Sequence, residues 1–248
     1  MRGDHAHHFL YYSQELEKDS ARIDITGDEH HHLHRVLRKR CGDTVYITNG
    51  RGIIVCGTVE TVGDTTTEVR VIGTVEERTP EQAVTLALAC LKKDAFDQAV
   101  RQCTELGITR CLPFAADLSH LTDYSDAYLE RLRRVVLSAM KQSFRSILPS
   151  IERVAPFERL LREAREHAVI VAGDADGQPL KPLHERPGRL LIVVGPEAGL
   201  SGDEKRQLEK CGCEFVSVSA YRLRSETSAA ALTAALLAPS CDGGGDPV

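Results

Sequence analysis

The stretch RLLIVVGPEAGLSGDE, residues 189–204, decides the class of fold. Its five consecutive apolar residues, 190–194, predict a strand buried on both faces, as the strands of parallel sheets are. Gly195-Pro196 ends that strand. Ser201 and Glu204 then form a capping-box pattern, so a helix is expected to begin directly after Ser201. Because ligands of open α/β sheets bind beside such strand-to-helix turns, this loop is a candidate binding site.

The loop after this strand combines glycines with the carboxylate of Glu197. It lacks the Lys of a P-loop and the G-x-G-x-x-G pattern of a dinucleotide site, and a carboxylate repels phosphate. The pattern favours a ligand that is neutral or cationic at this end and is recognised by hydrogen bonds. S-adenosylmethionine, with its neutral adenine and its sulfonium, is such a ligand, although a plain strand-to-helix turn explains these residues equally well.

Composition sets broad limits on what the chain does. Its 248 residues, 42% hydrophobic and 27% charged, are typical of a soluble globular protein with one large domain or two ordinary ones. No apolar run approaches the ~20 residues that span a bilayer, so we expect no membrane partner. Eight scattered cysteines without a CxxC pair indicate reduced thiols and a cytoplasmic location. The net charge of −5 excludes a general nucleic-acid coat but permits a local basic face.

The chain changes character near residue 78. Residues 1–78 contain β-branched runs with turn signals at Asn49-Gly50 and Gly63-Asp64, which predict hairpins of a small barrel or sheet. Residues 79–240 alternate strands with helices, including helices at 94–106 and 128–144, and predict a parallel sheet flanked by helices. Residues 173–177, GDADG, are expected to form the loop that ends a strand and to be a third wall of the same ligand crevice. Residues 241–248 are expected to be a disordered tail.

Two further stretches contain clusters of charged residues that are candidates for a functional site. In YRLRSETSAAAL, residues 221–232, Arg222, Arg224 and Glu226 crowd together between the last strand and the last helix, where they face either a site or solvent. In EHHHLHRVLRKRCGD, residues 29–43, the histidines lack the H-E-x-x-H arrangement, so a phosphate-contacting basic surface is favoured over a metal site. A solvated helix end remains the alternative there. The helix at 128–144 adds a basic edge.

Four motifs resemble those of one family. GPEAGLS at 195–201 resembles its GPEGGLS, LRSET at 223–227 its LRxET, HLHRVLR at 32–38 its HxxxVLR, and TELG at 104–107 its xELG. The family is that of the small-subunit (16S) ribosomal RNA uridine-N3 methyltransferases, of the SPOUT class, and the likeness covers nearly the whole chain. The sequence departs from the family at Ala198, Ser219 and Tyr221, and Lys141 and Phe144 occupy positions of its EQxGR element.

The resemblance implies an α/β protein with an N-terminal PUA-like β-barrel at 1–78 and a SPOUT methyltransferase domain at 79–240, tied in a deep trefoil knot. It implies a homodimer that binds small-subunit ribosomal RNA and S-adenosylmethionine, with no metal. By match, the cofactor site contains Ala172, Gly173, Gly195, Pro196, Glu197, Gly199, Leu200, Val218, Ser219, Leu223 and Thr227. The RNA site contains Arg35, Arg38, Gln142 and Arg145.

The expected reaction is methyl transfer to N3 of uridine, which is a poor nucleophile until its proton is lost. Arg224 is the candidate for stabilising the anion on O2 and O4, and Glu226 is the candidate base or the group that orients Arg224. Two alternatives stay open. One is a methyltransferase of the same class that acts on a ribose 2′-oxygen or on transfer RNA. The other is an RNA-binding protein with a degenerate pocket.

Overall fold

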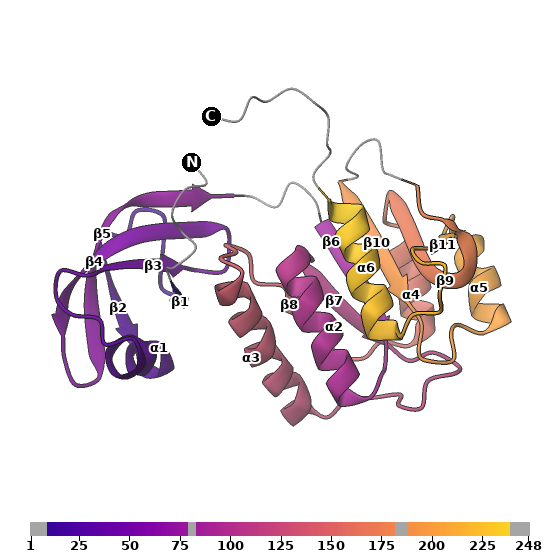
Figure 1. Cartoon of the computed structure of the whole chain (residues 1–248), viewed down its shortest axis with the longest axis horizontal. Coiled ribbons are helices and arrows are strands. Elements are labelled where there is room, and N and C mark those ends of the chain that lie inside the picture. The colour runs from indigo at the N-terminus through magenta and orange to yellow at the C-terminus, as the bar shows by residue number, and fades with distance from the viewer. Residues whose placement is uncertain (1–8, 79–82, 182–187, 239–248) are drawn as a thin grey trace, which may run out of the picture. The chain divides into compact units, whose positions relative to one another are not determined.

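The computed structural model describes residues 9–78, 83–181 and 188–238, and these divide into two compact units (Figure 1). The N-terminal unit contains the described residues up to 78 together with residues 136–148. The C-terminal unit contains residues 83–135 and the described residues from 149 onward. The hydropathy pattern does not indicate that residues 136–148 group with the N-terminal unit. The tail expected at 241–248 lies outside the described residues.

The N-terminal unit is built on a five-stranded sheet with the order β1-β3-β4-β5-β2. Its strands are β1 (Leu10–Tyr12), β2 (Arg22–Thr26), β3 (Thr44–Thr48), β4 (Ile53–Val62) and β5 (Thr66–Glu77). Both predicted hairpins are confirmed, because β3 and β4 pair antiparallel across Asn49-Gly50, and β4 and β5 pair antiparallel across Gly63-Asp64. The burial of β2 alternates along the strand, and its inward residues Ile23 and Ile25 join the core of this unit.

A short helical segment follows β2 and consists of α1 (Gly27–His31) and the π-helical η2 (His32–Val36). Leu33 lies in the core of the unit, but Val36 and Leu37 are exposed. Of the apolar residues in this segment, therefore, one faces inward and two face solvent. The segment presents apolar as well as basic side chains on its surface.

The C-terminal unit is built on a six-stranded sheet with the order β11-β9-β10-β6-β7-β8, in which every pair of neighbours is parallel. Its strands are β6 (Ala83–Ala89), β7 (Arg110–Phe114), β8 (Ser150–Ile151), β9 (Val169–Pro179), β10 (Arg189–Val194) and β11 (Glu214–Ser217). The stretch that opened the sequence analysis forms β10, which lies between β9 and β6 with residues 190–194 buried. The prediction of a doubly covered parallel strand is confirmed.

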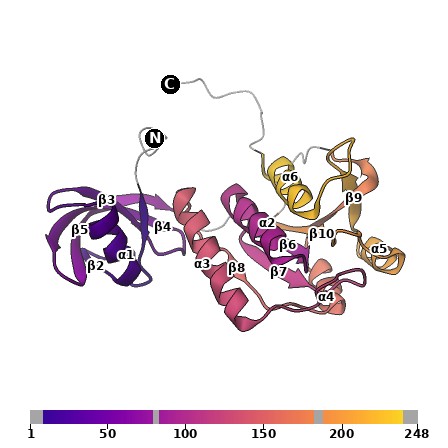
Figure 2. The ribbon, with the colours of Figure 1, turned by 60° about the horizontal axis from the view of Figure 1, so that its bottom comes forward.

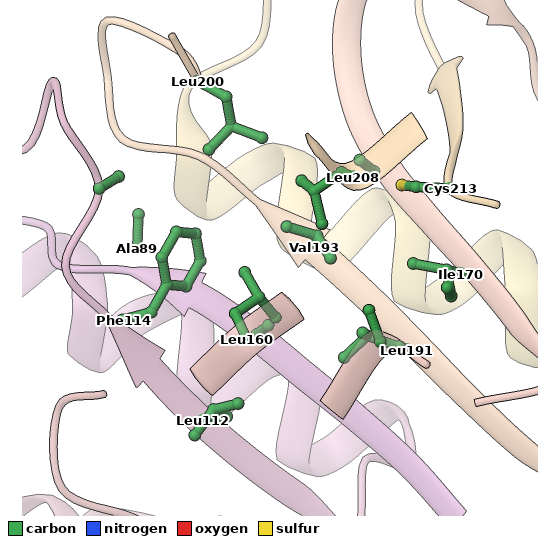
Figure 3. Close-up of a cluster of buried hydrophobic side chains, with 14 of the residues drawn as sticks. Ala89, Leu112, Phe114, Leu160, Ile170, Leu191, Val193, Leu200, Leu208 and Cys213 are labelled. Carbon is green, nitrogen blue, oxygen red and sulfur yellow. The ribbon is translucent and has the colours of Figure 1, made fainter. Parts of the chain in front are cut away.

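In the described residues, four helices belong wholly to this unit: α2 (Lys93–Leu106), α4 (Phe157–Ala164), α5 (Gly202–Glu209) and α6 (Ser225–Leu237). A further helix, α3 (Asp126–Gln142), begins in this unit, and its residues from 136 onward belong to the N-terminal unit. Figure 2 shows α2 and α6 together on one face and α4 and α5 on the other. Leu160 of α4 and Leu208 of α5 pack with Leu191 and Val193 of β10 in a buried cluster (Figure 3). On the opposite face, the Thr233 hydroxyl of α6 donates to Cys103 Sγ of α2 at 3.4 Å. No helix in the described ranges combines the length and apolar character needed to cross a membrane.

One local expectation is wrong. Residues 173–177 do not end the strand, because β9 continues to Pro179. The pairing of β9 with β11 instead skips this segment: Phe215 pairs with Ala172, and the next residue, Val216, pairs with Gln178. The five residues in between therefore form a bulge within the ladder. A bulge of this kind is set by the partner strand, which the local sequence does not specify.

Candidate functional site

A pocket of about 470 Å³ opens beside the bulge of β9 and at the carboxyl ends of β10 and β11 in the C-terminal unit. Three segments, 173–176, 194–200 and 216–225, supply nearly all of its wall, and Lys205 and Ser228 complete it. The structure brings together nine of the residues predicted for the cofactor site: Gly173, Gly195, Pro196, Glu197, Gly199, Leu200, Val218, Ser219 and Leu223. Segments separated by some fifty residues of sequence thus meet in one cavity.

The loop after β10 owes its shape to two glycines. Gly199 has a φ of +82°, a conformation that glycine adopts without cost, and its amide donates to the carbonyl of Pro196 at 2.8 Å. A Cβ on Gly195 would lie 3.0 Å from the backbone nitrogen of Leu200, so the loop folds closely over this residue. The result is a tight turn whose backbone faces the cavity.

Helix α5 fixes the far end of this loop. The Ser201 hydroxyl accepts a hydrogen bond from the amide of Glu204 at 3.2 Å, and the Glu204 carboxylate accepts one from the amide of Ser201 at 2.7 Å, so the predicted capping box is confirmed. Glu204 is buried, and its other oxygen accepts from the amide of Asp117 at 2.9 Å. One side chain therefore holds both the glycine loop and the loop after β7.

The loop after β11 is held by a chain of hydroxyl contacts. The Ser217 hydroxyl donates to the carbonyl of Ser219 at 2.7 Å, and the Ser219 hydroxyl accepts from the amide of Tyr221 at 3.0 Å. The Arg222 guanidinium then donates to the carbonyl of Glu197 at 3.2 Å. This last contact ties the loop after β11 to the loop after β10 beside the pocket.

The bulge in β9 brings acidic residues that sequence reasoning did not assign. Asp174 lines the pocket and forms an ion pair with Lys205 of α5. Burial opposes ionisation of Asp174, but the hydrogen bonds from Lys205 and from the amide of Asp176 outweigh it, so its pKa lies below the ordinary value. The GDADG stretch was the only available signal for these carboxylates, and nothing in the sequence marked Lys205.

The charges of the wall narrow the choice of ligand. Within the described residues, the lining carries the carboxylates of Asp174, Asp176 and Glu197 against the cationic side chains of Lys205 and Arg222. Lys205 is already paired with Asp174, and Arg222 is directed to a backbone carbonyl. The pocket therefore suits a ligand with neutral or positive groups, and its carboxylates would repel a phosphate.

Four predicted residues lie outside the lining. Ala172 is fully buried in the sheet, directly before Gly173, and Thr227 is exposed on the first turn of α6. The Arg224 side chain is 86% exposed, whereas Glu226 is buried, and Arg224 Nη1 lies 4.0 Å from Glu226 Oε1. Their neighbours Leu223 and Ser225 do line the pocket, so both catalytic candidates adjoin the cavity without facing into it.

The residues predicted to bind RNA all belong to the N-terminal unit. Arg35, Arg38 and Gln142 are exposed, and Arg145 is partly buried, which lowers the pKa of its guanidinium to about 10. Arg145 thus still carries its charge at neutral pH.

The two segments that carry these residues contact each other directly. Lys141 forms an ion pair with Glu29, and its ammonium also lies 5.2 Å from the centroid of the Phe9 ring. Phe144 has a φ of +55°, which is strained for a bulky residue, and its ring packs edge-on against Tyr46. The end of α3 is therefore fixed beside the basic helical segment.

The histidines of the cluster have structural partners: the rings of His30 and His34 stack with centroids 5.7 Å apart. His30 is buried, and its ring nitrogens contact the Thr67 hydroxyl at 2.9 Å and the Asp64 carbonyl at 3.2 Å. His32 stacks on Phe9 instead. In the described part of the chain, no group of three His, Cys, Asp or Glu residues is arranged to hold a metal ion.

Comparison with known sequences agrees with this arrangement. The family model of the RNA methyltransferase domain matches residues 78–237, and that of the RNA methyltransferase PUA domain matches residues 25–72. Ribosomal RNA small subunit methyltransferase E of Mycobacterium bovis is 30% identical over 236 residues, which cover 89% of this chain and 88% of that protein. The protein of the same name from Rickettsia conorii is 26% identical, with 89% and 91% covered.

Solved structures agree in fold. A ribosomal RNA small subunit methyltransferase E from Neisseria gonorrhoeae, bound to S-adenosyl methionine, superposes with a TM-score of 0.83 at 22% identity, covering 92% of this chain and 96% of that one. A probable rRNA-methyltransferase from Porphyromonas gingivalis gives a TM-score of 0.77 at 27% identity, covering 91% and 95%. With a PUA-like unit before an α/β unit whose pocket has the expected loops, the chain belongs to the family of RNA methyltransferases that includes ribosomal RNA small subunit methyltransferase E.

Proposed function

We propose that the protein methylates N3 of a uridine in small-subunit ribosomal RNA, using S-adenosylmethionine, in the cytoplasm. The observation that carries this proposal is the pocket formed by the loops after β10 and β11 and the bulge of β9, in a chain of the RNA methyltransferase family. The names of the relatives give the small-subunit RNA, and the resemblance in GPEAGLS and LRSET gives the uridine nitrogen.

The pocket fits S-adenosylmethionine by its chemistry. Apolar groups of Leu200, Val218 and Leu223 offer surfaces for an adenine ring, and the turn around Gly195 and Gly199 offers backbone groups for hydrogen bonds. The carboxylates of the wall favour a cationic sulfonium over a phosphate. When bound, this cofactor supplies an electrophilic methyl group on sulfur, and no metal is needed for the transfer.

Arg224 and Glu226 have different roles in the methyl transfer. The reaction forms an N–CH₃ bond and breaks the S–CH₃ bond, and the proton on N3 must leave for a base or for water. The exposed guanidinium of Arg224 is available to a uracil at the mouth of the pocket, where it stabilises negative charge on O2 and O4. Glu226 lies behind it at 4.0 Å and is buried, which favours the role of orienting Arg224 over that of accepting the proton.

The N-terminal unit provides the surface for RNA. Arg35, Arg38 and Gln142 are exposed, and the Lys141–Glu29 pair fixes the end of α3 to the helical segment that carries Arg35 and leads directly to Arg38. Contacts of this kind to phosphates position an RNA without reading its sequence. The choice of nucleotide then rests on the pocket in the C-terminal unit.

Two structural features complete the proposal. The first is a homodimer: α6 exposes the small apolar residues Ala234 and Ala235, and α2, which packs against α6, exposes Leu106, so a second copy would cover apolar surface on this helix pair. The second is a deep trefoil knot in the C-terminal unit. Its support is the resemblance of GPEAGLS and LRSET to the motifs of the SPOUT class. Sedimentation velocity of the full chain tests the dimer.

Nucleoside mass spectrometry tests the activity. Ribosomal RNA from cells that lack the gene should have lost one 3-methyluridine, and incubation of that RNA or its subunit with the protein and S-adenosylmethionine should restore it. A 2′-O-methylated nucleoside, or a change confined to transfer RNA, would contradict the proposed position. Calorimetry with S-adenosylmethionine that shows no binding would indicate an RNA-binding protein without enzymatic activity.

A further inference from the structure

Tyr221 has the most exposed large side chain among the hydrophobic residues that the structure describes. It is 82% exposed, whereas the next, Ile72 in the N-terminal unit, is 60% exposed. Tyr221 nevertheless lines the pocket, so its ring lies at the mouth, with most of its surface in solvent. An aromatic ring in this position leaves a large apolar face uncovered beside the site of methyl transfer.

The backbone of Tyr221 is fixed on both sides. On one side, the Ser219 hydroxyl accepts from the Tyr221 amide at 3.0 Å, and Ser219 is itself held by the Ser217 hydroxyl. On the other side, Arg222 reaches the carbonyl of Glu197 at 3.2 Å. An exposed ring on an anchored loop loses little conformational freedom when it binds a partner, so it is suited to recognition.

The charges around Tyr221 indicate what that partner is. Arg222 and Arg224, both exposed, follow it in the chain, and Arg222 also lines the pocket beside the carboxylates of Asp174, Asp176 and Glu197. The two guanidinium groups attract phosphate to this side of the pocket, whereas the carboxylates, of which Asp174 is partly buried and Asp176 and Glu197 are exposed, repel it from the wall that they form. Aromatic rings with neighbouring arginines are the usual stacking surface for unpaired nucleotides.

We propose that Tyr221 is a stacking platform for an unpaired base of the RNA substrate, with Arg222 contacting the adjoining phosphate. This inference rests on the proposed function, since it concerns the RNA entering the same pocket. It makes Tyr221 a specificity-determining residue. The chain departs from its family's pattern here, so the platform is a property of this sequence.

Three substitutions separate stacking from simple hydrophobic contact. Tyr221→Phe keeps the π face, Tyr221→Leu keeps apolar volume without it, and Tyr221→Ala removes both. Leu118→Ala is the matched control, because Leu118 is an exposed apolar residue of the same unit, at 45%, and does not line the pocket. Each full-length variant is measured for KM and kcat with small-subunit ribosomal RNA, for the Kd of S-adenosylmethionine, and for sedimentation.

We expect Tyr221→Ala and Tyr221→Leu to raise the KM for RNA about five- to hundredfold, the range of single base–aromatic contacts. Tyr221→Phe should stay within about twofold of the wild type, and the Kd of S-adenosylmethionine should change little in any variant. Equal KM values for the alanine variant and the wild type would overturn the proposal. Full activity of the leucine variant, or loss of self-association in the alanine variant, would also overturn it and indicate a protein contact instead.

A binding measurement keeps this test independent of turnover. A short fluorescein-labelled oligouridylate is titrated with each variant in the presence of S-adenosylhomocysteine, and fluorescence anisotropy reports the Kd. The same order of affinities is expected, with phenylalanine close to tyrosine and leucine close to alanine. Should the wild type transfer no methyl group, the proposed function fails while this titration still decides the role of Tyr221. Equal Kd values for the alanine variant and the wild type would refute that role.

Discussion

Replacing Gly177 by alanine should loosen the C-terminal unit at the bulge of β9. A Cβ at this position would lie 2.7 Å from the carbon and oxygen of Phe215 and from the nitrogen of Val216, all of them backbone atoms of β11. Ordinary contact begins near 3.4 Å, so β11 must move by about 0.7 Å. The strand lies at the edge of the sheet and is therefore able to shift without rupture.

The cost follows from this displacement. Overpacking of this size destabilises a folded protein by about 1–3 kcal/mol, which for a chain of this length lowers Tm by about 2–12 °C. Pocket residues Val218 and Ser219 directly follow β11, so the affinity for S-adenosylmethionine should fall as well.

A second glycine provides the control. Gly188, directly before β10, has no atom of the described residues within 4 Å of its Cβ position and does not have a positive φ, so Gly188→Ala is expected to change only the freedom of the unfolded chain. Differential scanning calorimetry and titration calorimetry on both variants isolate the effect of the clash. If the Gly177→Ala variant has the same Tm as the Gly188→Ala variant and the same affinity for S-adenosylmethionine, the close approach of β9 and β11 is contradicted.

Three further outcomes are expected. Arg224→Ala should abolish methyl transfer in the mass-spectrometric assay and leave the Kd of S-adenosylmethionine within a few-fold, because the side chain adjoins the pocket without lining it; unchanged turnover would refute its role. Lys205→Met should raise the pKa of Asp174, followed by carboxyl NMR, because the hydrogen bond that opposes burial is lost; an unshifted titration would contradict the pair. Burial raises the thiol pKa of Cys90 and Cys213 to about 12. The stability that these protonated thiols contribute is therefore fully present below about pH 9 and is lost as the pH rises towards 12. A urea unfolding midpoint that does not fall between about pH 8 and pH 10 would contradict this burial.

The features predicted from sequence were those encoded within a few neighbouring residues. The apolar run 190–194, the capping box of Ser201 and Glu204, and the hairpin at Asn49-Gly50 each formed as expected, because local periodicity and turn chemistry specify them. The glycine loop and the residues before LRSET met in one pocket, since the carboxyl ends of the parallel strands β10 and β11 lie at one edge of the sheet, with β9 between them.

The remaining features depend on contacts between distant segments. The bulge at 173–177 exists because β11 pairs on both sides of it, and the ion pair of Asp174 with Lys205 joins elements thirty residues apart. The orientation of Arg224, outside the lining, is equally a property of the folded loop. A single sequence contains no local pattern from which such contacts follow, so their residues were missed or placed only approximately.

Glu204 links the motions of two loops. Its two carboxylate oxygens hold the amides of Ser201 and Asp117, which lie 84 residues apart in the chain. A rotation of the Glu204 side chain breaks both hydrogen bonds, so the glycine loop and the loop after β7 should open together. Hydrogen exchange at the amides of Ser201 and Asp117 should then give the same free energy of opening, as expected when both loops open in one cooperative step.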